Sequence, residues 1–116
     1  MEMNREQRYD KFRTSLQAKV KLEIALEDFF TPGLPDVCRN AYGAYLRQRI
    51  RPAVELLIEQ EDTEKLEALD RLGMLPTNLV DGFLQTAVNR RKNAAMVWLL
   101  RKKQDCLGFA PRDFSL

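Results

Sequence analysis

The sequence predicts a small all-α protein of about six helices, with two stacked helix-turn-helix hairpins in its C-terminal half. Apolar side chains recur every three or four residues along most of the chain, as they do on one face of an α-helix. Prolines and glycines separate these periodic segments, and both residue types end helices. Residues 53–72 also align with residues 84–103, 31 positions further on, so that apolar residues pair with apolar residues. A period of this length is typical of stacked hairpins that bury a shared core.

The length and composition suit one folded domain. The 116 residues are 45% hydrophobic and 31% charged, with both signs of charge, which is ordinary for a globular chain. We therefore expect residues 1–116 to form a single domain, with a helical pair over 4–49, two hairpins over 52–104 and a tail over 105–116. The net charge of +2 is too small to indicate a nucleic-acid or membrane partner by itself.

The N-terminal pair begins with the longest predicted helix, which runs from Asn4 to Phe29. The sequence Thr31-Pro32-Gly33-Leu34-Pro35 ends it, because two prolines around a glycine cannot continue a helix. A second helix is expected over Asp36–Arg49. The apolar face of the first helix is expected to carry Tyr9, Phe12, Leu16, Val20 and Ile24, and that of the second Val37, Ala41, Tyr45 and Leu46.

The first hairpin is predicted to contain helices over Pro52–Gln60 and Glu64–Leu72. Because the residue before a proline disfavours helical geometry, Arg51 marks a boundary, and a kinked continuous helix is the alternative. The second hairpin is predicted to contain a helix that runs from a Thr77 cap to about Asn89, followed by Ala94–Lys103. The shared interior is expected to hold Leu57, Leu69, Val88 and Leu100, and Trp98 is also expected in the core.

The two hairpins carry opposite surface charges. The second hairpin has basic residues and no acid between residues 84 and 103, whereas the first has mostly acids. Similar cores with unlike surfaces indicate binding rather than catalysis. The acids of the first hairpin are Glu55, Glu59, Glu61, Asp62, Glu64, Glu67 and Asp70.

The second hairpin resembles an ankyrin repeat. The similarity lies in Leu84-x-x-Ala87, then Asn93, then Val97-Trp98-Leu99-Leu100, which follow the order of the two ankyrin helices and their turn. The first hairpin has Leu56-Leu57, Asp62, Leu66-x-x-Leu69 and Leu72-Gly73 in the same order, although neither unit has the Thr-Pro-Leu-His opening. The resemblance implies a protein-binding surface along residues 53–103 and no catalytic residues. An ordinary antiparallel bundle, in which apolar residues also recur every three or four positions, is the alternative.

The chain lacks the residues that most enzymes use. It has no histidine, which removes serine-histidine, cysteine-histidine and zinc-water chemistry within this chain. Glycine-rich phosphate loops are missing, because the glycines stand alone. Carboxylate pairs such as Glu55 and Glu59 are typical of a solvated helix surface. We therefore expect no enzymatic activity, cofactor or metal.

The partner-binding candidates form two basic trios and an apolar tail. The trios suit an acidic protein surface; the alternative function is a small nucleic-acid-associated regulatory protein that contacts phosphates through the same residues. The tail is expected to dock on its own domain or on another protein. The candidates are Arg90, Arg91, Lys92, Arg101, Lys102, Lys103, Phe109, Phe114 and Leu116.

The chain is expected to be cytoplasmic, with another protein as its partner and no membrane contact. Its longest apolar run, Ala94–Leu100, is far shorter than the roughly 20 residues of a membrane-spanning helix. Its first residues do not resemble a secretion signal. The two cysteines, Cys38 and Cys106, are expected to be free thiols. The sequence leaves self-association open, since stacked hairpins with uncovered ends can form a homodimer that covers them.

Overall fold

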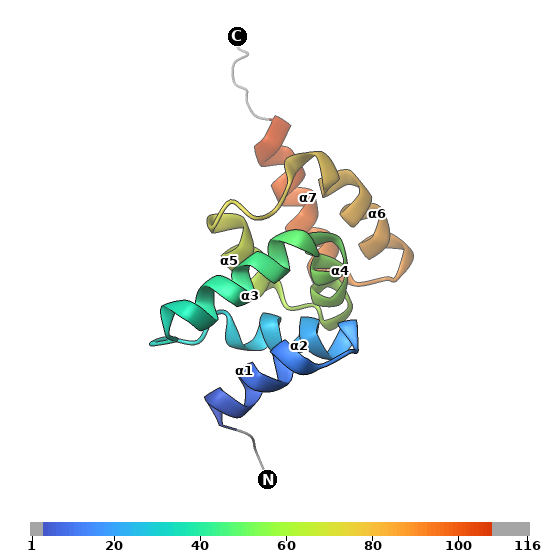
Figure 1. The fold of residues 1–116 in the computed structure, drawn as a ribbon. Coiled ribbons are helices and arrows are strands. Elements are labelled where there is room, and N and C mark those ends of the chain that lie inside the picture. The colour runs from blue at the N-terminus through green and yellow to red at the C-terminus, as the bar shows by residue number, and fades with distance from the viewer. Residues whose placement is uncertain (1–3, 108–116) are drawn as a thin grey trace. The chain divides into compact units, whose positions relative to one another are not determined.

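The computed structural model describes residues 4–107, and every regular element in this range is helical (Figure 1). The prediction of an all-α fold is confirmed, with seven α-helices in the described range where about six were expected. The chain divides into two compact units, and the boundary lies between Ala53 and Val54. A single domain over residues 1–116 stays a prediction. The elements are α1 Arg5–Thr14, α2 Ala18–Asp28, α3 Asp36–Gln48, α4 Ile50–Gln60, α5 Thr63–Arg71, a short 3₁₀ helix Thr77–Leu79, α6 Val80–Asn89 and α7 Asn93–Leu107.

The single long helix over residues 4–29 is wrong, because the chain breaks after Thr14 and folds back as two helices. Ser15 adopts an extended backbone, and its side-chain oxygen accepts a hydrogen bond from the amide of Gln17 at 3.1 Å. Leu16, expected on the apolar face, is fully exposed in this break. The Arg8 guanidinium donates to both carboxylate oxygens of Asp28, at 3.0 and 2.7 Å. A continuous helix would hold these two residues roughly 30 Å apart, so the pair forms only when α1 returns along α2.

Aromatic rings form the core of the first unit. Phe12 of α1 makes T-shaped ring contacts with Tyr42 and Tyr45 of α3, with ring centroids 4.8 and 5.3 Å apart. Gly43 lies against Phe29, and a Cβ there would approach that ring to 3.1 Å. The small residue in α3 therefore permits close packing of the end of α2. Val37, expected on the apolar face of α3, is instead exposed.

The boundary between α3 and α4 falls two residues before the predicted one. Arg49 leaves helical geometry, with φ −122° and ψ 37°, and α4 begins at Ile50. Pro52 therefore lies in the first turn of α4, where a residue without an amide proton loses no helical hydrogen bond. Neither an Arg51 boundary nor a kink at Pro52 describes this arrangement.

In the second unit, the two hairpins turn in the same way at positions 30 residues apart. The amide of Asp62 donates to the carbonyl of Leu57, and 30 residues later the amide of Lys92 donates to the carbonyl of Ala87. Glu61 and Arg91, one residue before these amides, both adopt positive φ values, 54° and 58°. This pattern is the Schellman motif that ends many helices. The helices after the turns begin at Thr63 and Asn93, which keeps the same spacing.

The predicted shared interior is half wrong. Leu57 and Leu69 are fully buried, whereas Val88 and Leu100 are exposed. The predicted alignment used an offset of 31, and the backbone repeats at 30. One residue is about 100° around an α-helix, which is enough to move a side chain from the core face to the surface. The buried equivalents of Leu57 and Leu69 are in fact Ala87 and Leu99.

Candidate protein-binding groove

Acids of the first hairpin contact basic residues of the second. Glu59 of α4 pairs with Arg90 and Lys92, each at 3.3 Å, and brings these two members of the first basic trio together. Asp70 of α5 pairs with Lys102 of α7 at 2.6 Å. Some of the opposite surface charges that indicated binding thus form ion pairs within the unit itself.

The remaining basic candidates differ in their surroundings. Lys103 pairs with Asp81 of α6 at 3.1 Å. Arg91 and Arg101 are exposed and form no ion pair with any other described residue. Two of the six basic candidates therefore keep a charge without a carboxylate partner in the described part of the chain. The three apolar candidates of the tail, Phe109, Phe114 and Leu116, lie outside the described residues.

Glu61 joins the turn of the first hairpin to the start of α7. Its carboxylate accepts a hydrogen bond from the amide of Ala94 at 2.9 Å. Amides in the first turn of a helix have no partner within the helix, and the helix dipole favours a negative charge there. α7 begins at Asn93, one residue before the predicted start at Ala94. The first hairpin therefore caps a helix of the second.

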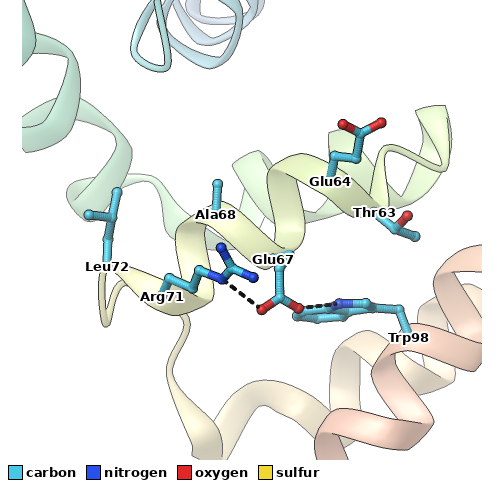
Figure 2. Close-up of a pocket in the computed structure, with 7 residues that line it drawn as sticks. All are labelled: Thr63, Glu64, Glu67, Ala68, Arg71, Leu72 and Trp98. Atoms are coloured by element: carbon cyan, nitrogen blue, oxygen red, sulfur yellow. Dashed lines mark hydrogen bonds and ion pairs between the residues drawn. The ribbon is translucent and has the colours of Figure 1, made fainter. Parts of the chain in front are cut away.

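An open groove with a volume of about 640 Å³ lies along α5 in the second unit. Its lining is mostly apolar. Glu64, Ala68 and Leu72 follow one another at four-residue intervals and so share a helix face. Trp98 of α7 lies beside α5 and completes the lining (Figure 2). We call this hollow the α5–Trp98 groove, and its residues are Thr63, Glu64, Glu67, Ala68, Arg71, Leu72 and Trp98.

Trp98 is half-buried at the wall of this groove, so the expectation of a core tryptophan is wrong. Its indole N–H donates to Glu67 Oε1 at 3.0 Å, and Arg71 Nε donates to Glu67 Oε2 at 3.2 Å (Figure 2). The indole bond, followed by the Arg71 bond and charge, lowers the pKa of Glu67 below its usual value. The three side chains therefore hold the ring in a fixed orientation while part of its surface stays open.

A second, smaller pocket shares Glu67 and Trp98 with the groove. It has a volume of about 100 Å³, and its lining is mostly polar. Arg101 lies here, next to the paired residues Asp70 and Lys102. The structure thus places one basic candidate beside Trp98, although the sequence suggested no link between them.

The α5–Trp98 groove was not predicted from the sequence, because the apolar spacing of α7 placed Trp98 in the core. Leu72 is exposed at the end of α5, where Gly73 turns the chain with φ 73°. A usable signal was the Glu67–Arg71 spacing of four residues, which marks an exposed ion pair on α5. No sequence pattern indicated that the indole N–H would bind Glu67, which lies 31 residues earlier on α5.

Comparison with known proteins finds no family model, curated protein or solved structure that matches this chain. Among residues 4–107, no helix combines the length and the apolar character needed to span a bilayer. The same residues contain no group of three or more cysteine, aspartate or glutamate side chains arranged to hold a metal ion.

Proposed function

We propose that this chain is a non-enzymatic protein-interaction module of ankyrin-like hairpins, which holds a segment of another protein in the α5–Trp98 groove. The observation that carries the proposal is a groove with a mostly apolar lining, in which a hydrogen bond to Glu67 holds the half-buried Trp98 ring at the wall. Tryptophan gives a large contact area at a low cost in conformational entropy, and it is enriched where proteins bind one another. We also propose that the protein acts in the cytoplasm.

The groove residues suggest the chemistry of the bound segment. Ala68, Leu72 and Trp98 offer apolar surface for an aliphatic or aromatic side chain. Glu64 is exposed at the rim and forms no ion pair with a described residue. If the bound segment carries a basic side chain next to its apolar one, that side chain can pair with the Glu64 carboxylate and lie against the face of Trp98. We therefore expect the segment to combine an apolar anchor with a lysine or arginine.

The alternative function, nucleic-acid binding, has less support. Affinity for nucleic acids depends on lysine and arginine side chains that are free to neutralise phosphates. Arg90, Lys92, Lys102 and Lys103 each contact a carboxylate instead. A phosphate would have to displace these pairs, and the carboxylates would then repel it.

Photo-crosslinking in cells tests the proposed function. A photoreactive amino acid replaces Leu72 in the groove, and in the control it replaces Val37, which is also exposed but lies on α3. We expect a defined protein adduct from position 72 only, unchanged by nuclease. Ala68→Trp, which fills the groove, should remove the adduct, whereas Ala44→Trp on the exposed surface of α3 should not.

Two results would contradict the proposed function. Equal adducts from positions 72 and 37 would show that the groove is not the contact surface. Loss of the adduct on nuclease treatment, together with loss in Arg91→Ser/Arg101→Ser, would support the nucleic-acid function instead. Homodimerisation stays a prediction, which light scattering of the purified chain tests.

A further inference from the structure

Three large apolar side chains of the second hairpin are unexpectedly exposed. The exposed fractions are 45% for Val88, 51% for Val97 and 46% for Leu100. Val97 and Leu100 lie three residues apart on α7 and so share one helix face. We call these three residues the open end of the hairpin array.

The spacing of 30 residues explains why these positions are exposed. The equivalents of Val97 and Leu100 in the first hairpin are Glu67 and Asp70, which contact Trp98 and Lys102 of α7. The equivalent of Val88 is Ile58, which is fully buried. The open end is therefore the surface with which a hairpin of this kind contacts the hairpin that follows it. No helix in the described residues follows α7 to cover it.

The side chains of the open end define the chemistry of its occupant. On α5, the carboxylates of Glu67 and Asp70 bind the Trp98 indole and the Lys102 ammonium group. The equivalent positions on α7 carry a valine and a leucine, which are exposed. Apolar side chains gain free energy by leaving water, and they give no partner to polar groups. The occupant must therefore be apolar. It can also carry an acidic residue, because Arg101, next to Leu100 in the sequence, is exposed and forms no ion pair with a described residue.

The chain itself contains a segment with this chemistry, directly after α7. Residues 108–116 include Phe109, Phe114 and Leu116, with Asp113 before the second phenylalanine. In α7, Val97 lies about 15 Å before Leu107, because each helical residue rises 1.5 Å. An extended chain spans about 3.3 Å per residue, so Phe114 can reach about 23 Å from Leu107. The segment is thus long enough to return along α7 as far as Val97.

We propose that residues 108–116 fold back on α7 and bury Phe114 and Leu116 against Val97 and Leu100, with Asp113 beside Arg101. The segment then covers the open end in place of a further hairpin. Covalent attachment holds it near this face at a high effective concentration, which favours it over a separate chain. This proposal is independent of the α5–Trp98 groove and goes beyond the proposed function.

Hydrogen exchange and crosslinking of the full chain test the proposal. In Phe114→Ser/Leu116→Ser, we expect the α7 amides around Leu100 to exchange about tenfold faster, because two apolar contacts are lost. The control is Leu16→Ser, at a fully exposed leucine of the first unit, which should leave α7 exchange unchanged. A photoreactive amino acid in place of Leu100 should crosslink within one chain to residues 108–116, as read by mass spectrometry.

Three outcomes would overturn the proposal. Crosslinks between two chains, with a dimer in light scattering, would assign the open end to a second copy. Crosslinks from position 72 rather than position 100 to residues 108–116 would place the segment in the α5–Trp98 groove. Unchanged α7 exchange in Phe114→Ser/Leu116→Ser, without an intrachain crosslink, would show that the open end stays uncovered.

Discussion

At the scale of single residues, Tyr42 combines full burial with an unpaired hydroxyl group. Its ring is fully buried and packs against Phe12 and Tyr9, while its hydroxyl oxygen has no hydrogen-bond partner in residues 4–107. Burial, together with the nearby Asp28 charge, raises the pKa of Tyr42 to about 12. A buried polar group without a partner costs stability, because it gives up its bonds to water.

We therefore expect Tyr42→Phe to increase the free energy of unfolding by about 1 kcal/mol. The ring contacts stay in place, and only the unpaired hydroxyl is lost. Chemical denaturation measures the change. Tyr45→Phe is the control, because the Tyr45 hydroxyl donates to the Ala18 carbonyl at 3.4 Å, and its removal should give no increase. A clear loss of stability in Tyr42→Phe would mean that the hydroxyl has a partner.

The raised pKa of Tyr42 also predicts a loss of stability at high pH. The ordinary tyrosine pKa is about 10. The folded state holds the Tyr42 proton more tightly than the unfolded state does. The free energy of unfolding is therefore unaffected by this group below about pH 10 and falls as the pH rises toward 12. Ultraviolet absorbance of the phenolate should show one tyrosine that titrates near pH 12, and Tyr42→Phe should remove it. Absence of a phenolate transition near pH 12 that Tyr42→Phe removes would contradict this prediction.

At the scale of elements, the ends of the helices decide the path of the chain. Gly73 occupies the left-handed position after α5, where glycine carries no penalty, but Arg91 occupies the corresponding position after α6 with φ 58°. For a residue with a side chain, this conformation costs roughly 1 kcal/mol. The second hairpin turn therefore contains backbone strain that its sequence does not relieve.

Arg91→Gly should stabilise the protein by about 0.5–1 kcal/mol, because glycine adopts this conformation freely. Arg90→Gly is the comparison variant, since it removes a side chain from a residue whose φ of −92° is unstrained, together with its ion pair to Glu59. It should destabilise the protein. Thermal unfolding of both variants measures the difference, and a loss of stability in both would rule out strain at Arg91.

The break between α1 and α2 gives a second prediction at this scale. Leu16→Ser should change the free energy of unfolding by less than about 0.5 kcal/mol, because the side chain is fully exposed. Phe12→Ala should cost about 3–5 kcal/mol, because the ring fills the core between Tyr42 and Tyr45. Denaturant titrations of both variants compare them. Similar losses would indicate the single long helix instead.

At the scale of the molecule, opposite charges join the two hairpins. Asp70 and Lys102 are the most buried of these pairs, and their side chains are 22% and 19% exposed. Partial burial keeps salt and water from screening the pair fully. The acidic first hairpin and basic second hairpin thus contribute to the second unit before any partner binds.

Asp70→Lys should destabilise the protein by about 1–2 kcal/mol, because it leaves Lys102 facing a like charge. The exchanged pair Asp70→Lys/Lys102→Asp should recover at least half of the loss. Glu55→Lys is the control with the same change in net charge, since Glu55 forms no ion pair with a described residue. Urea unfolding of these proteins, the parent and the single variant Lys102→Asp measures the coupling. A double variant whose loss of stability equals the sum of the losses in Asp70→Lys and Lys102→Asp would argue against the pair.

The sequence by itself determined the helical class and most helix ends. Residue spacing of three to four, the proline-glycine break after α2 and the Gly73 turn are local features, and local geometry sets them. The acids and bases that join the hairpins were visible as charges, but their pairing was not.

Only the tertiary structure decided which faces the helices bury. An alignment error of one residue, 31 instead of 30, turns a helix by about 100°, and this error placed Val88 and Leu100 in the core. The break at Ser15 lets Arg8 contact Asp28, 20 residues later, and no local pattern contains that contact. The same holds for Trp98, whose exposure depends on a carboxylate 31 residues earlier. Periodicity therefore identifies helices, whereas contacts between distant residues determine their rotation and so the surface available for binding.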